Sequence, residues 1–166
     1  MDTFLAIASK RDTRRYTREP LPPQTERKIL EAGRVAGSAR NRQPWRFLVV
    51  DDRARRERLA QAVFVPDNVR GAAFVVALQA RSSLDAGRCA ENMMLAAWNE
   101  GVASCPNGFA DPAAARAALG LGPDDELATV LTFGFPARVR APETRTPDEW
   151  LERADRRPLE ELVRRL

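Results

Sequence analysis

The pattern of apolar and polar positions along the chain predicts helices that alternate with strands. Phe4, Ile7 and Ala8 have the spacing of one face of a short amphipathic helix within residues 2–10. A second amphipathic helix follows the prolines at positions 22 and 23, which are tolerated before or within a first helical turn. Gly37 is placed where this helix would end.

Three apolar runs predict the strands of a sheet. Residues 46–50 form the first, and "ELATVLTFGFPA" contains the third. Between them, "GAAFVVALQA" is almost continuously apolar, which is typical of a central strand covered on both faces. Strands interleaved with helices place the chain in the α/β or α+β class.

The longest predicted helix begins near Asp85, a suitable N-cap, and is apolar or small around much of its circumference. Such a helix can lie at a contact between two copies, because small residues allow close approach, or it can be the core helix of a monomer. A charged helix within "DDRARRERLAQAVF" and an alanine-rich helix capped by Asp111 complete the predicted elements.

Length and composition indicate one soluble globular domain over residues 1–166. A chain of 166 residues can bury a core without disulfides. No apolar run approaches the roughly 18 residues that a membrane span requires, and the N-terminus lacks the apolar core of a signal peptide. We therefore expect a cytoplasmic protein with no membrane partner.

Histidine is absent and the two cysteines, Cys89 and Cys105, lack the spacing of a zinc site. We therefore expect no metal site and two buried, reduced thiols. The absence of histidine also removes the usual general base near neutral pH. Any catalysis must then use a cofactor, a carboxylate, a thiol or bound water.

The charge is strongly biased towards arginine: all but two of the 27 basic residues are arginine, and the net charge is +4. Guanidinium groups match phosphate, so anion binding is one interpretation, and a compositional habit of the source genome is the other. The arginines are scattered and aromatic residues are few, so we expect no nucleic-acid partner. A basic nucleic-acid-binding or anion-binding domain remains an alternative.

Two stretches in the first third of the chain carry groups suited to binding. Arg11, Thr13, Arg14 and Arg15 form a possible phosphate clamp, or simply a solvated run of charge. "GSARNRQPW", residues 37–45, combines small residues with two amides that each offer a donor and an acceptor to the edge of a heterocycle. Its proline predicts an extended residue at position 43, and the alternative is a plain turn before the strand.

The third stretch is "CPNGFAD", residues 105–111. Pro-Asn-Gly predicts a tight turn, and its backbone N–H groups can face a ligand. The alternative is a turn without a binding role.

Five stretches in order resemble the FMN-dependent nitroreductase family, and the resemblance reaches nearly the whole chain. They are "AIASKRDTRRYTREPLP", "AGSARNRQPWRFLVV", "DAGRCAENMMLAAWNEGVASCPNGF", "FGFPA" and "RRPLEELV". The second is the most specific, with small residues before Asn-x-Gln-Pro-Trp and a strand.

The resemblance implies an α+β fold with a mixed central sheet flanked by helices. It also implies a homodimer with two FMN sites at its interface, and a C-terminal arm, "PLEELVRRL", that crosses to the partner's sheet. Local sequence favours a helix there, so the two expectations conflict. The chain is short for the family, and the lack of lid insertions suggests an open, shallow site.

Carried over residue by residue, the resemblance assigns an FMN site. Arg11, Thr13 and Arg15 would hold the ribityl and phosphate groups, and Arg156 or Arg157 would complete the phosphate site. The remaining residues would contact the flavin ring, some of them from the other subunit: Gly37, Ser38, Ala39, Asn41, Gln43, Pro106, Asn107 and Gly108. Asn68 is a further residue that could reach the flavin.

The function implied is an NAD(P)H-dependent FMN oxidoreductase. Hydride would pass from NAD(P)H through flavin N5 to a nitroaromatic, a quinone or a related small-molecule acceptor, with no catalytic side chain needed. The alternative is a flavin-binding storage or regulatory protein with little turnover, suggested by the missing lid.

Overall fold

The computed structural model describes residues 1–81 and 83–166, which form two compact units. Residues 11–140 form the central unit, and residues 1–10 together with 141–166 form the terminal unit.

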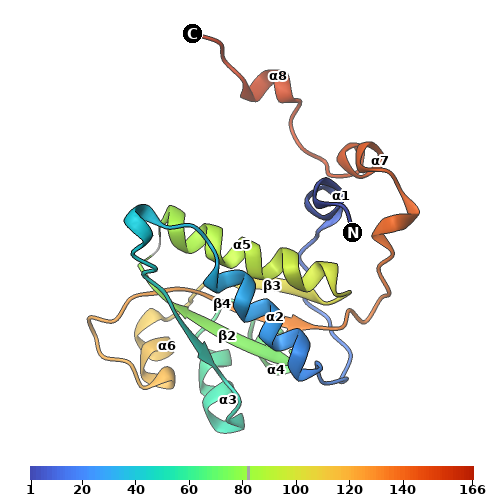
Figure 1. Cartoon of the computed structure of the whole chain (residues 1–166). Coiled ribbons are helices and arrows are strands. Elements are labelled where there is room, and N and C mark those ends of the chain that lie inside the picture. Colours follow the sequence, from blue (N-terminus) through green and yellow to red (C-terminus); the bar gives the residue numbers. More distant parts are fainter. Residues whose placement is uncertain (82) are drawn as a thin grey trace. The chain divides into compact units, whose positions relative to one another are not determined.

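The central unit is built on a four-stranded sheet (Figure 1). Its strands are β1 (Arg46–Val49), β2 (Phe74–Gln79), β3 (Ala103–Asn107) and β4 (Leu127–Gly134), in the order β1-β2-β4-β3. All three strand pairs are antiparallel. The predicted α+β class is confirmed, but among the described residues the sheet is antiparallel rather than mixed as the family resemblance implied. A parallel neighbour would have to come from another segment pairing with an edge strand.

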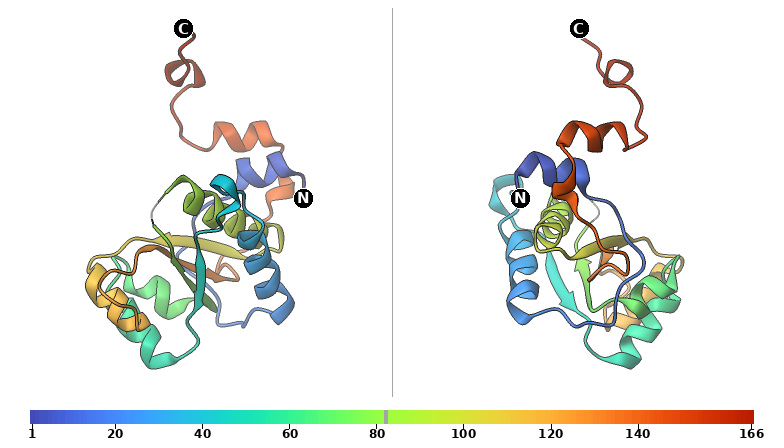
Figure 2. Two further views of the ribbon diagram at one scale, coloured as in Figure 1. Left: turned by 60° about the vertical axis from the view of Figure 1, so that its left-hand side comes forward. Right: turned by 90° about the vertical axis from the view of Figure 1, so that its right-hand side faces the viewer.

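Helices cover both faces of this sheet (Figures 1 and 2). Alternate residues of a strand point to opposite faces, and β2 shows this because its apolar residues divide between two core clusters. On one face lie α2 (Pro23–Arg34) and α5 (Leu84–Asn99). On the other lie α3 (Arg53–Gln61), α4 (Pro66–Gly71) and α6 (Pro112–Leu119). The prediction of a central strand buried on both faces is thus confirmed for β2.

Two predicted helix boundaries are wrong. Helix α2 ends at Arg34, and Gly37 lies beyond its C-cap without a left-handed backbone. Helix α5 begins at Leu84 because Ser83, not Asp85, is its N-cap and accepts from the N–H of Ala86 at 3.3 Å. By contrast, the predicted cap of α6 is confirmed: the Asp111 carboxylate accepts from the N–H of Ala114.

The predicted turn at Pro-Asn-Gly is also wrong, because Pro106 and Asn107 belong to β3. Backbone pairing with β4 outweighs the local turn preference. A proline is acceptable here because β3 is an edge strand, where a missing N–H leaves no gap between two strands. Helix α4 was not predicted, since six residues give too short a periodic pattern.

The terminal unit contains α1 (Thr3–Ser9), the 3-10 turn η2 (Pro142–Thr144), α7 (Pro147–Glu152) and α8 (Leu159–Leu162). Thr146 and Glu149 form a capping box that starts α7, and the indole N–H of Trp150 donates to the carbonyl of Pro142 at 2.9 Å. Helix α8 is a single turn, as local sequence favours. The exchanged arm stays a prediction.

Both cysteines are buried thiols that form no disulfide among the described residues, as predicted. Burial raises the pKa of the Cys89 thiol to about 11, so this thiol is protonated near neutral pH. Among the helices of the described residues, none has the length and hydropathy of a membrane crossing.

Gly134 gives a first testable prediction about this fold. A Cβ added there would lie 2.8 Å from Cγ and 2.9 Å from Cβ of Tyr16. We expect Gly134→Ala to lower the free energy of unfolding by about 1–3 kcal/mol, as overpacking does. Urea denaturation measures it, with Gly71→Ala as the matched control because nothing lies within 4 Å of its added Cβ. Equal stabilities for the two variants would contradict this view of the Tyr16–Gly134 contact.

Candidate functional site

The predicted phosphate clamp lies along the outer edge of the sheet, at β3 and the end of β4. The N–H of Thr13 donates to the carbonyl of Ser104 at 3.0 Å, and the carbonyl of Arg15 accepts from the N–H of Ala137 at 3.0 Å. The segment is therefore fixed by backbone hydrogen bonds, although it belongs to no helix or regular strand.

The side chains of this segment suit an anionic ligand. The Thr13 hydroxyl is buried and has no hydrogen-bond partner among the described residues, a condition that a ligand oxygen would relieve. Arg14 and Arg15 line a surface hollow of about 410 Å³ together with Arg138 and Arg140. Asp12 lies on the same wall, so the charge there is not purely positive.

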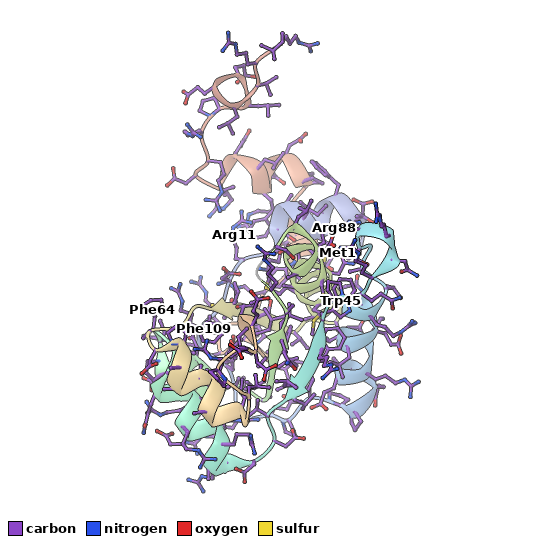
Figure 3. All side chains as sticks on the ribbon, turned by 90° about the vertical axis from the view of Figure 1, so that its left-hand side faces the viewer. Met1, Arg11, Trp45, Phe64, Arg88 and Phe109 are labelled. Atoms are coloured by element: carbon purple, nitrogen blue, oxygen red, sulfur yellow. The ribbon has the colours of Figure 1, made fainter. Side chains whose placement is uncertain are left out.

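Residues 106–108, from the predicted stretch at 105–111, lie at the same edge, where β3 ends. Pro106 and Gly108 are exposed, and the carbonyl of Gly108 accepts from the N–H of Phe64 at 3.2 Å. A Cβ at Gly108 would lie 3.3 Å from the Phe64 ring, which is itself 72% exposed. Phe64 and Phe109 adjoin at this end of the sheet (Figure 3). Phe64 was not among the predicted site residues, because its position depends on where α3 ends.

Asn107 differs from its neighbours because its side chain points into the core and is 5% exposed. Its Nδ2 donates to the carbonyls of Cys105 at 3.0 Å and Val130 at 2.9 Å, and its Oδ1 accepts from Asn68 at 2.8 Å. Any ligand contact of Asn107 must therefore use its backbone. Asn68 is 1% exposed, so it supports the end of β3 from within the core.

Residues 37–43, from the predicted stretch at 37–45, form a tight loop before β1 that includes η1 (Ala39–Asn41). The Ser38 hydroxyl accepts from the N–H of Gln43 at 2.9 Å, which closes the loop on itself. The Asp85 carboxylate accepts from the N–H of Ala39 at 3.0 Å and ties the loop to α5. Sequence reasoning missed this role of Asp85.

Arg88 of α5 also lies beside this loop (Figure 3), although it was not among the predicted site residues. Its guanidinium occupies the space in which a Cβ of Gly37 would stand. Only the far end of this flexible side chain would meet an added Cβ, so Arg88 could move aside and does not by itself require a glycine at position 37. The positively charged Arg88 guanidinium thus lies beside the loop, 3.9 Å from the Asp85 carboxylate.

The loop also holds an unusual backbone. Arg40, Asn41 and Gln43 have φ values of 53°, 54° and 48°, in the left-handed region that non-glycine residues seldom adopt. The prediction of an extended Gln43 is therefore wrong, since the Ser38–Gln43 hydrogen bond overrides the preference set by Pro44. Such strain collects at binding and catalytic sites, which supports a binding role for this loop.

One chain does not bring the three stretches together. The loop at 37–43 precedes β1, whereas the clamp and Pro106–Gly108 lie at β3, and these are the two opposite edge strands. Three strand spacings separate the edges, about 14 Å. Arg156 and Arg157 belong to the terminal unit. The central unit thus carries two half-sites: the clamp half-site at β3 and the loop half-site at β1.

The Nitroreductase family model matches residues 7–77 and 66–135, which include both half-sites. The chain belongs to the nitroreductase family. The predicted family is thereby confirmed, and the match covers every strand of the sheet.

Solved structures of other nitroreductase-family proteins share the fold. A protein from Desulfovibrio desulfuricans, assigned as a nitroreductase and crystallised in complex with FMN, is 31% identical with a TM-score of 0.82. The superposition covers 98% of this chain and 96% of that one. A nitroreductase family protein from Clostridium difficile has a TM-score of 0.82 at 21% identity, covering 99% and 98% of the two chains.

Curated relatives match over shorter segments. An NADH dehydrogenase from Thermus thermophilus is 41% identical over 80 residues, which are 48% of this chain and 39% of the relative. A 5,6-dimethylbenzimidazole synthase from Rhodospirillum rubrum is 38% identical over 77 residues, which are 46% and 34% of the two chains. The matched segment thus spans little more than a third of each of these two relatives.

Proposed function

We propose that this nitroreductase-family chain is an FMN-dependent oxidoreductase. When bound, the flavin supplies two-electron chemistry through N5, with NAD(P)H as the hydride donor and a nitroaromatic, a quinone or a related small molecule as the acceptor. The observation that carries the proposal is the likeness over nearly the full length to a protein solved with FMN, combined with the two half-sites. Relatives named for NADH or NAD(P)H support the donor class.

The residues of the clamp half-site fit the phosphate and ribityl groups. Arg11 and Arg15 would neutralise the phosphate, and the Thr13 hydroxyl, buried and unpartnered in the described chain, would gain a hydrogen bond. Arg156 or Arg157 would add a further guanidinium from the terminal unit.

The ring would be held by backbone groups and small residues. Pro106, Gly108 and the backbone of Asn107 would face it from one half-site. The loop at residues 37–43 would contact the ring from the other half-site, through Gly37, Ser38, Ala39, Asn41 and Gln43.

We further propose that the protein is a homodimer with two shared sites and that the whole chain acts as one FMN-binding domain. Because the half-sites lie at opposite edges of one sheet, a complete site requires the loop of one copy to meet the clamp of another. Exposed apolar residues at the C-terminus, among them Leu159 and Leu162, would provide an arm for the partner.

The purified protein tests this function directly. We expect it to be yellow, or to take up added FMN, and to bleach with NADH or NADPH under anaerobic conditions. Reoxidation by a quinone or a nitroaromatic should then restore the colour. A protein that binds FMN but is reduced by neither donor would favour the storage or regulatory alternative. A colourless protein that takes up no FMN would exclude both.

A further inference from the structure

A buried polar chain crosses the core between the clamp segment and the end of β3. The Tyr16 hydroxyl lies 3.0 Å from the Thr132 hydroxyl, and Asn107 Nδ2 donates to that same hydroxyl at 3.2 Å. Asn68 Nδ2 then donates to Asn107 Oδ1 at 2.8 Å. Tyr16 adjoins Arg15, and Asn107 adjoins Gly108. The chain therefore links the proposed phosphate end of the clamp half-site to its ring end.

The Tyr16 hydroxyl takes part in this series of hydrogen bonds in its neutral form. Burial raises the pKa of its phenol above the usual range, opposed by the hydrogen bond to Thr132. The links therefore hold over the whole pH range in which a flavoprotein would be assayed.

Asn68 is the least expected of these hydrogen-bonded side chains. Its Oδ1 is buried and has no hydrogen-bond partner among the described residues. A buried acceptor without a donor destabilises a fold, and an apolar side chain of similar size would avoid that penalty. Core packing alone therefore does not account for an amide at this position of α4.

We propose that Asn68 is a positioning residue for the ring end of the flavin site, an inference that rests on the proposed function. Its N–H group gives Asn107 Oδ1 a donor, so the Asn107 amide can keep both core carbonyls, those of Cys105 and Val130, on its Nδ2. Without Asn68, that oxygen would be left buried and unpaired. The amide would then gain by turning towards water, and the adjoining Asn107–Gly108 peptide would move with it.

Asn68→Leu separates positioning from stability. The substitution removes the unpaired Asn68 Oδ1 but leaves Asn107 Oδ1 without its donor, so the two penalties offset each other and we expect Tm to stay nearly unchanged. For the same variant we expect Kd for FMN to rise about tenfold, equivalent to about 1.4 kcal/mol. Hydrogen exchange of the amides in residues 105–108, measured without FMN, should become faster by a similar factor. A purely structural Asn68 would instead lower Tm and leave Kd of the folded protein unchanged.

Val69→Ala is the matched control, because Val69 is the next residue of α4 and is fully buried. It should lower Tm while leaving both FMN affinity and exchange of residues 105–108 as in the unchanged protein. Asn68→Ala, which removes the same N–H group with a smaller side chain, should repeat the effect of Asn68→Leu on exchange and affinity. If Asn68→Leu fails to fold, this second variant decides the question.

The two proposals fail in distinguishable ways. Unchanged hydrogen-exchange rates at residues 105–108 in both variants would overturn the positioning role, whatever the measured Kd for FMN. If the unchanged protein binds no FMN, the proposed function fails and the role of Asn68 in a flavin site falls with it, even if exchange responds.

Discussion

Replacing both Arg11 and Arg15 by alanine is expected to raise Kd for FMN by at least about 100-fold. A hydrogen bond to a charged group contributes about 1.5–3 kcal/mol, and two of them to one phosphate give about 3–6 kcal/mol. The backbone of this segment is held independently, by Thr13 on Ser104 and by Ala137 on Arg15. The loss should therefore come from missing charge rather than from a displaced segment. Fluorescence titration of FMN against the apoprotein measures Kd.

Two arginines of α3 provide the control for this double variant. Arg53 and Arg58 are exposed and lie outside both half-sites, so Arg53→Ala with Arg58→Ala removes the same net charge. We expect that variant to change Kd by less than about twofold, because exposed charges are screened by salt. Equal affinity losses in the two double variants would point to net charge, and unchanged affinity in Arg11→Ala with Arg15→Ala would refute the phosphate assignment.

Much of the fold could be predicted because its dominant elements follow regular patterns. The apolar run of β2 predicted a central strand, and its alternate residues do fill two cores. The cap of α6 at Asp111 is a local signal and was found. Signals of this kind depend on neighbours in sequence, so the sequence alone reveals them.

The errors occurred where contacts distant in sequence decide the conformation. Pro106 and Asn107 have a local preference for a turn, but pairing with β4 makes them a strand. Gln43 precedes a proline, yet its N–H is held by Ser38 and its φ is positive. Asn68 lies in no motif, and its hydrogen bond to Asn107 follows only from the approach of α4 to the end of β3.

The candidate site was predicted as a set of residues but not as an arrangement. The order β1-β2-β4-β3 separates the loop at 37–43 from Pro106–Gly108, and nothing in the sequence fixes that order. The family resemblance did imply contributions from two subunits. The topology supplies a physical reason for them, since neither half-site can be moved to the other edge without rebuilding the sheet.

Deletion of residues 158–166 is expected to convert a dimer into a monomer and to abolish tight FMN binding together with it. The deleted segment holds Leu159, Leu162, Val163 and Leu166, which are 67%, 53%, 54% and 108% exposed. Burying four such side chains against a partner would stabilise the dimer by several kcal/mol, at about 1.5–3 kcal/mol for each fully buried residue. Sedimentation velocity with and without FMN measures the assembly.

Arg164→Ala with Arg165→Ala is the matched control, because it changes the same segment and keeps its apolar residues. We expect this variant to remain dimeric and yellow. FMN binds across the interface in the proposed assembly, so added FMN should also strengthen the dimer of the full chain by mass action. A truncated chain that stays dimeric with unchanged FMN affinity would show that the C-terminal segment is no exchanged arm.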